Sequence, residues 1–353
     1  MSQTSNIEQQ PNDQTGIERI EPMFVHPEIS DRISHITGQK IFRVEIGAGR
    51  HYRNEAGTTF KSITTFLDSI MPPNRFLQTW RESKIEELGS VDAAREFVTA
   101  TADFGTALHI AVAEFCRTGR VDWAEFNDWA FMYMTRDMKL TGHTLHAAVE
   151  ELTRDFAAII KFLHDYECKV IAVELPVFSK HGFATLVDLV VEMNEKCYTE
   201  KTPPEKRRRI VAGGNLKSGK KGFYESHIFQ LCGERMAFNE TYADALGFPI
   251  VEVFNLAPTN WRTEPDYKFK NQTSAIDETG VFDQFGMFIE LAKSRGVLGE
   301  PKKTFTVFEG VTEYGANPAI NMKNLTYDEF TRRRLDAAFA GSIDVIPVVC
   351  RFD

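Results

Sequence analysis

The chain has 353 residues, of which 42% are hydrophobic, and its formal net charge is −9. This excess of acid excludes a protein that binds nucleic acid over its whole surface, although it leaves room for a local basic groove. Five widely spaced cysteines predict free thiols in a reducing compartment and no iron–sulfur cluster. Neither a signal peptide nor a long apolar run is visible, so we expect a cytoplasmic protein, in the host cytoplasm if the chain is viral, with no membrane partner.

Helical and strand patterns alternate along the chain. Helices are predicted at residues 63–71, 74–88, 91–117, 123–140, 146–166, 223–239, 282–295 and 327–339. Strands are predicted at residues 41–46, 170–178, 184–193, 209–217, 249–256, 304–308 and 345–352, and residues 257–273 are predicted to be loop-rich. This pattern predicts an α/β fold, in which a central mixed sheet is flanked by helices, with N-terminal helical and C-terminal additions.

Four parts are expected along the chain. Residues 1–21 are polar and are predicted to be disordered, and residues 22–165 carry a strand and a helical region. Residues 166–256 are predicted to form the core. Residues 257–353 are predicted to be an extension that completes the sheet, and we assign no chemistry to them.

Two neighbouring strands are predicted to bring an acid, an amide and an amine together. In residues 184–193, Asp188 lies among aliphatic residues, where a carboxylate is costly unless a cation or donor lies beside it. In residues 209–217, Asn215 and Lys217 are two positions apart and therefore share one face. If the two strands pair, these three side chains converge.

The connection between these two strands is longer than a hairpin needs. We therefore expect it to project over the site. It contains the basic run 206–209, for which a solvated loop edge and a phosphate contact are equally good interpretations. Lys220 and Lys221 follow the second strand and are predicted to bind nucleic acid.

Predicted helices add polar residues to this part of the chain. Gly105 and His109 are four positions apart and share a face, although a lone helical histidine is more often structural than a ligand. In the later helix, His227, Gln230 and Glu234 form one stripe, which we expect to face the site.

An aromatic residue among cations marks a second candidate surface. Arg75 and Trp80 lie in the predicted helix 74–88, and this combination suits base stacking and phosphate contact on a single strand. Packing of Trp80 in the core is an equally good interpretation.

The order and spacing of these motifs resemble the PD-(D/E)xK nucleases of the RecB-like branch, over about residues 41–245. Asp188 stands where that family has its first acid, Lys217 where it has its lysine, and Gln230 where it has the glutamine of a Gln-x-x-x-Tyr helix. Residues 60–64 are similar to the N-terminal part of the mitochondrial genome-maintenance exonucleases and their phage relatives.

The resemblance implies roles for further residues. His109 matches a helical histidine that binds metal in many members, and Leu216 would offer the metal its backbone carbonyl. Glu174 lies in a strand where relatives often keep an acid that assists the metal or the water. Ser62 and Thr64 match a segment that approaches the DNA backbone, although a helix cap is an equally good interpretation of Ser62.

The implied chemistry is hydrolysis of DNA that is single-stranded or has free ends, in replication or repair. Carboxylates hold Mg²⁺ or Mn²⁺, which neutralises the scissile phosphate and activates water. The resemblance gives Asp188 and His109 the role of metal ligands, with Asn215 as a weakened third ligand. Lys217 would activate water, and Gln230 would support it.

Two departures from the family pattern bear on this chemistry. Asn215 stands where the family has Asp or Glu, and Glu234 stands where it has the helix tyrosine. A neutral amide removes one unit of charge and coordinates more weakly than a carboxylate. We therefore expect a folded nuclease site with impaired metal binding and low turnover.

Three interpretations of Asn215 remain open at this point. It is a substitution that traps bound nucleic acid, or a natural loss that leaves a non-catalytic DNA-binding or assembly protein, or a position whose acid has migrated. Glu225 is the best candidate for the migrated acid. A structural role without nucleic acid is a further alternative, and it predicts no salt-dependent DNA binding.

Overall fold

A computed structural model describes most of the chain. The described residues are 18–20, 22–37, 41–46, 49–54, 57–72, 75–198, 201–218, 222–299, 302–306 and 349–351. They divide into two units: residues up to 20, 40–60 and from 301 belong to the first, and residues 21–39 and 61–300 to the second.

The first unit consists of short strands. Strand β1 (Glu18–Ile20) pairs antiparallel with β3 (Ile41–Ile46), which pairs antiparallel with β4 (Gly49–Asn54). Strand β11 (Lys302–Thr306) pairs with β12 (Val349–Arg351) and with the beginning of β5 (Thr58–Ser62).

The second unit is built on a mixed sheet, whose strands we give in spatial order. They are β2 (Phe24–Val25), β6 (Lys169–Phe178), β7 (Phe183–Asn194), β8 (Arg209–Leu216), β9 (Glu252–Pro258) and β10 (Tyr267–Asn271). Neighbours are antiparallel except β8 and β9, which are parallel because a helix crosses over between them. The end of β5 runs parallel to the beginning of β7, with Lys61 opposite Phe183.

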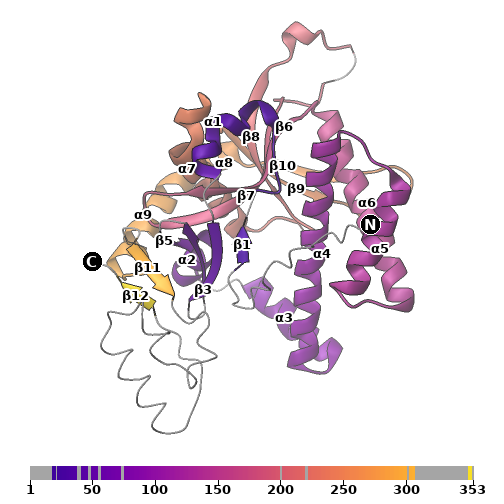
Figure 1. Cartoon of the computed structure of the whole chain (residues 1–353), viewed down its shortest axis with the longest axis horizontal. Coiled ribbons are helices and arrows are strands. Elements are labelled where there is room, and N and C mark those ends of the chain that lie inside the picture. The colour runs from indigo at the N-terminus through magenta and orange to yellow at the C-terminus, as the bar shows by residue number, and fades with distance from the viewer. Residues whose placement is uncertain are drawn as a thin grey trace, which may run out of the picture. The chain divides into compact units, whose positions relative to one another are not determined.

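Helices cover both faces of this sheet. They are α1 (Pro27–Thr37), α2 (Ile63–Ile70), α3 (Arg75–Leu88), α4 (Val91–Thr118), α5 (Trp123–Arg136), α6 (Gly142–Asp165), α7 (Glu225–Leu246), α8 (Thr273–Glu278) and α9 (Val281–Ser294). Helices α4, α5 and α6 lie together on one side of the sheet in Figure 1, and α7, α8 and α9 on the other. This arrangement confirms the predicted α/β fold with a mixed sheet between helices.

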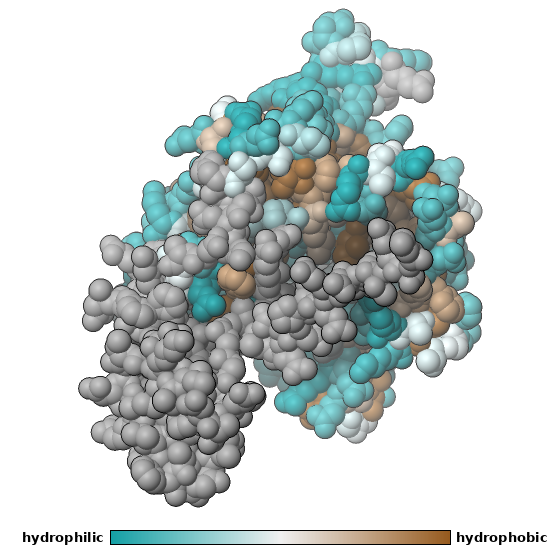
Figure 2. All heavy atoms as spheres, in the orientation of Figure 1, coloured by the Kyte–Doolittle hydropathy of each residue, from teal (hydrophilic) through white to brown (hydrophobic). Residues whose placement is uncertain are grey.

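Each face of the sheet has its own hydrophobic core. The first cluster packs α1, α2, α7, α8 and α9 on one face, and Phe66, Phe238 and Phe285 are fully buried in it. The second packs α4, α5 and α6 on the other face around Phe156 and Phe162. Much of the outer surface of the described residues in Figure 2 is hydrophilic, as expected when two apolar layers are closed inside.

Pairing of the two central strands agrees with the sequence. Leu189 lies opposite Gly214 in the antiparallel β7–β8 ladder, so Asp188 and Asn215 come next to each other just beyond it. The predicted strand 249–256 is also confirmed, as β9 in the same sheet. The predicted helix 327–339 lies outside the described residues.

Two predictions for the ends of the chain are corrected. Residues 257–273 were expected to be loop-rich, but they contain β10, because Tyr267 and Phe269 alternate inward and pack against Phe162. The predicted disordered tail 1–21 includes β1, whose residues 18–20 gain backbone partners in β3. The predicted boundaries after residues 165 and 256 stay predictions.

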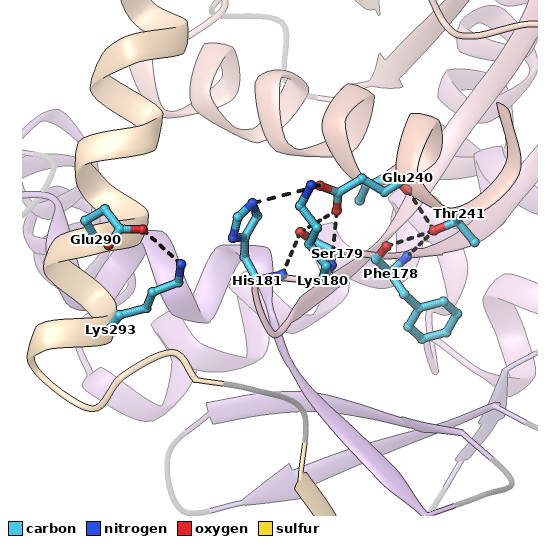
Figure 3. A network of polar contacts seen from close by, with 9 residues as sticks. Phe178, Ser179, Lys180, His181, Glu240, Thr241, Glu290 and Lys293 are labelled. Carbon is cyan, nitrogen blue, oxygen red and sulfur yellow. Dashed lines mark hydrogen bonds and ion pairs between the residues drawn. The ribbon is translucent and has the colours of Figure 1, made fainter. Parts of the chain in front are cut away.

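The turn between β6 and β7 is fastened to α7 (Figure 3). Glu240 accepts hydrogen bonds from the Ser179 hydroxyl at 2.8 Å and the Lys180 amide at 3.0 Å. At the next residue of α7, the Thr241 hydroxyl accepts a hydrogen bond from the Phe178 amide at 2.9 Å. These contacts hold α7 in register with the two strands that carry Glu174 and Asp188.

The ring of Phe254 on β9 packs over position 214 of β8 and requires glycine there. A Cβ atom placed there would lie 2.4 Å from the ring of Phe254. We expect Gly214→Ala to lower the free energy of unfolding by about 1–3 kcal/mol, because a buried ring must move. Urea unfolding measures this, with Gly286→Ala as the control, since a Cβ at Gly286 meets nothing within 4 Å. An unfolding midpoint equal to that of the unmodified protein would contradict this packing argument.

Within the part of the chain that the structure describes, every helix is too short or too polar to cross a bilayer.

Candidate metal centre

Three potential metal ligands meet where α4 crosses β6 and β7. His109 from α4, Glu174 from β6 and Asp188 from β7 each offer one ligand atom, and these atoms all lie within 4.8 Å of one another. His109 Nδ1 is hydrogen-bonded to Glu174 Oε1. The structure therefore brings together two predicted metal ligands, His109 and Asp188, and adds Glu174 to them.

The backbone at Glu174 is unusual for a strand. Its φ is +54°, in the left-handed region that residues other than glycine seldom adopt. Residues two apart in a regular strand share a face, but Val173 and Leu175 belong to the cores on opposite faces of the sheet. Their partners in β7, Leu189 and Val187, are divided between the two cores in the same way. The alternation of both strands is thus interrupted at Glu174 and Asp188. A left-handed backbone conformation like that of Glu174 typically costs a residue other than glycine about 1–3 kcal/mol, and such conformations are concentrated at functional sites.

Asp188 is held by the neighbouring strand. The backbone amide of Leu216 donates to Asp188 Oδ2 at 2.8 Å. Leu216 thus contributes its N–H to the site, and metal binding by its carbonyl stays a prediction. Asp188 needs such a donor because loss of hydration and the nearby Glu174 both disfavour its ionised form.

A chain of hydrogen bonds joins the remaining predicted site residues. Lys217 Nζ donates to Gln230 Oε1 at 3.4 Å, and Gln230 Nε2 donates to Glu234 Oε1 at 2.8 Å. Asn215 Nδ2 donates to the same Glu234 oxygen at 3.0 Å. Gln230 and Glu234 are one helical turn apart and therefore share one face of α7. Their hydrogen bonds with Lys217 and Asn215 show that this face is turned to the site, as predicted.

Electrostatic effects in the site are large. Burial would lower the pKa of His109, but the charge of Glu174, followed by its hydrogen bond and by Asp188, raises it to about 9. Loss of hydration raises the pKa of Asp188 to about 6, although His109 acts in the opposite sense. Burial and then the charge of Asp188 raise the pKa of Glu234 well above its usual range. The site is thus a set of acids that are short of positive charge.

His227 has a different role from its neighbours on the stripe. Its Nδ1 accepts a hydrogen bond from the backbone amide of Tyr224, which caps the beginning of α7. Burial, with the nearby charge of Lys217, lowers the pKa of His227 to about 4. His227 is therefore neutral at physiological pH and adds no cation to the site.

The residues fit a divalent cation. Asn215 Oδ1 and Glu234 Oε2 are buried acceptors that no donor among the described residues satisfies. A buried acceptor without a partner costs about 1–3 kcal/mol, which a cation or a water held by it offsets. Two carboxylates suit Mg²⁺ or Mn²⁺, and an imidazole ligand favours the transition metal.

The structure does not place every predicted residue at this group. The exposed Glu225 lies in the first turn of α7. Ser62 is the cap of α2, its hydroxyl accepting from the Thr65 amide, whereas Thr64 is exposed. Trp80 is half-buried and its ring centroid lies 6.3 Å from that of the exposed Phe97, so it is not a core residue, and its contact with nucleic acid stays a prediction.

Three predicted nucleic-acid contacts cannot be placed. Lys220 and Lys221 lie outside the described residues, and so does the side chain of Arg75.

The prediction that the long connection projects over the site is wrong. Because β7 and β8 are antiparallel, it leaves beside the Asn194–Arg209 pair, while Asn215 lies at the other end of β8. Six residues of strand separate the two ends, which is roughly 20 Å. In Figure 1 this connection extends away from the sheet at the top of the view.

The basic run in this connection is paired with acids. Arg208 lies 3.3 Å from Glu195, and Arg209 lies 3.1 Å from Glu192. Arg207 is paired with Glu167. At this end of the hairpin the run forms a solvated loop edge, and its distance from the site argues against contact with a phosphate bound there.

Glu234 is the residue whose contribution the sequence did not reveal. The pattern placed it on the stripe that faces the site but gave it no function. The available signal was its position one helical turn after Gln230.

No protein-family model matches this chain, and no curated protein matches it.

Proposed function

We propose that this protein is a metal-dependent DNA nuclease of the PD-(D/E)xK type, similar to the RecB-like branch. One observation supports this above the others: the ligand atoms of His109 on α4, Glu174 on β6 and Asp188 on β7 lie within 4.8 Å of one another, and Lys217 directly follows β8, the strand next to β7. An imidazole, two carboxylates and an amine at one point of a sheet suit hydrolysis of a phosphodiester.

His109, Glu174 and Asp188 would hold the cation, with Asn215 as a neutral ligand beside them. Bound there, Mg²⁺ or Mn²⁺ would neutralise charge on the scissile phosphate and lower the pKa of a nearby water. The imidazole of His109 makes Mn²⁺ the better fit of the two.

The protein's own groups would orient the reaction. Water adds to phosphorus, the ester bond to one sugar oxygen breaks, and that oxygen takes up a proton as it leaves. The ammonium of Lys217 would hold the attacking water or the negative charge that develops on the phosphate. Gln230 accepts from Lys217 and so fixes where this charge lies.

DNA as the substrate, single-stranded or with free ends, rests on the resemblance of residues 41–245. The exposed Thr64 is in keeping with a backbone contact near the beginning of α2. Replication or repair in the cytoplasm, that of the host if the chain is viral, is the setting that fits such an activity.

A non-catalytic DNA-binding or assembly protein is the second candidate. Its support is that His109 and Glu174 satisfy each other as an ion pair without a cation, while Asn215 replaces the expected acid. A site of this kind would keep the fold and bind DNA without cutting it.

End-labelled single- and double-stranded DNA distinguishes the two candidates. We expect the full chain to shorten labelled DNA in millimolar Mn²⁺ and a chelator to stop it. The Lys217→Met variant should lose about 10²-fold or more in rate while it binds DNA, because only the charge near the phosphate is removed. Salt-dependent binding with no cleavage in Mn²⁺ or Mg²⁺ would establish the second candidate.

A further inference from the structure

An acid lies directly behind the amide that replaces the expected carboxylate. Asn215 is 1% exposed and Glu234 is 2% exposed, so both are removed from solvent. Asn215 Nδ2 donates to Glu234 Oε1 at 3.0 Å. The carboxyl group that is missing from strand β8 is thus present one hydrogen bond away, on helix α7.

The contacts of Glu234 fix the orientation of Asn215. Two amides, those of Asn215 and Gln230, donate to one oxygen of Glu234. Because Asn215 Nδ2 points to Glu234, the Oδ1 atom of the same amide points away from Glu234. This Oδ1 is a buried acceptor that has no donor among the described residues. An amide oxygen left unsatisfied beside Asp188 is available as a ligand.

A carboxylate behind a ligand also strengthens it. When an amide N–H donates to an anion, electron density moves onto the amide oxygen, as it does when a carboxylate accepts from the far nitrogen of a metal-bound histidine. Such outer partners typically change metal affinity by about 10- to 100-fold. A neutral Asn215 supported in this way approaches the function of the acid that it replaces.

The two positions are complementary, since only one of them can carry an acid at low cost. Aspartate at position 215 would place two carboxylates about 3.0 Å apart in a buried setting, and carboxylates this close cannot both ionise. We propose that Glu234 is the migrated acid of the site. It acts as a positioning residue that orients and polarises Asn215 as a cation ligand.

This inference rests on the proposed metal site, but not on DNA cleavage. It makes a different prediction from simple loss of the acid, for which restoring aspartate at position 215 would by itself repair the site. It also replaces Glu225 as the candidate for the migrated acid, because Glu225 is exposed at the beginning of α7.

Mn²⁺ affinity measured by calorimetry at pH 8, without DNA, tests the inference in the full chain. We expect Glu234→Gln to weaken Mn²⁺ binding by about 10- to 100-fold. The exchanged pair, Asn215→Asp with Glu234→Gln, should recover affinity to within a few-fold of the unmodified protein. Asp244→Asn is the matched control, because it removes one exposed charge from the same helix.

Thermal unfolding of the metal-free proteins at pH 8 is the second measurement. Asn215→Asp alone should unfold at a lower temperature than the exchanged pair, since only the single variant brings two acids together. Glu234→Gln with unchanged Mn²⁺ affinity, an exchanged pair that binds no better than Glu234→Gln, or an unmodified protein that binds no Mn²⁺ would each overturn the inference. If the Mn²⁺ pattern holds and no variant cuts DNA, the nuclease proposal fails and the role of Glu234 stands.

Discussion

Asp188→Asn is expected to abolish Mn²⁺-dependent cleavage, with a loss of about 10³-fold or more in rate. Asp188 is the one member of the ligand group that also lies beside Lys217 and opposite Asn215, so every part of the proposed chemistry meets there. Removing a residue that only hydrogen-bonds to a metal ligand weakens metal binding by up to roughly 100-fold. Removing Asp188, which is itself one of the proposed ligands, should weaken Mn²⁺ binding by more than that.

The same variant should fold normally, which separates loss of chemistry from loss of structure. Asparagine keeps an oxygen that can accept from the Leu216 amide, the contact that Asp188 makes at 2.8 Å. It also removes a carboxylate whose pKa is raised to about 6 by loss of hydration, so the metal-free variant should be at least as stable at pH 8.

Glu192→Gln is the matched control for this experiment. It removes one acid from the same strand, and its ion pair with Arg209 is partly exposed and worth at most about 1 kcal/mol. Cleavage rates measured on end-labelled DNA should be unchanged in Glu192→Gln. Equal loss in both variants, or full activity in Asp188→Asn, would show that Asp188 does not hold the cation.

Much of this site follows from strand alternation. Asp188 is isolated among aliphatic residues, and Asn215 and Lys217 share a face, so their convergence required only that the two strands pair. Helical periodicity likewise placed Gln230 on the face of α7 that reaches Lys217. These predictions rest on local periods of two and 3.6 residues, which the sequence displays directly.

The contributions of Glu174 and Glu234 depend on geometry that no local period encodes. Glu174 adopts a positive φ within a strand, which a glutamate gives no reason to expect. The role of Glu234 depends on how deeply α7 sits against β8. The preceding residue, Gly233, lets α7 pack closely against α2, since a Cβ there would lie 2.2 Å from Ile63 Cδ1.

The position of the long connection could have been predicted correctly. Asp188 is six residues before Asn194, and Asn215 is six residues after Arg209, so an antiparallel pair must put the connection and the site at opposite ends. Connection length alone suggested a lid. Counting along the two strands gives the correct answer without any structure.

Mn²⁺ binding should strengthen steeply as pH rises, because the ligands hold protons that the cation must displace. The pKa of His109 is raised to about 9, so its imidazole is protonated at pH 7 in the metal-free protein, and only the neutral form binds metal. We expect affinity to increase by about tenfold or more per pH unit between pH 6.5 and 8.5. Below pH 6, protonation of Asp188 should weaken binding further.

Stability of the metal-free protein should change in the opposite direction. Both pKa values are raised in the folded state, so the folded protein holds more protons than the unfolded chain in two pH windows. The contribution of Asp188 is present below its usual pKa of 3.8 and is lost as pH rises through about 6. That of His109 is present below 6.5 and is lost as pH rises through about 9. Saturating Mn²⁺ should offset this decline, since binding to the folded state alone stabilises it.

Calorimetry in buffers of different ionisation enthalpy measures the effect directly. Near pH 7.5, binding of one Mn²⁺ should release about one proton from His109. His109→Gln is the informative variant, because glutamine keeps a possible oxygen ligand but has no proton to displace in this range. Its affinity should be weaker and nearly independent of pH between 6.5 and 8.5. A pH dependence equally steep in both proteins would show that the displaced proton comes from another group, and that His109 does not bind the cation.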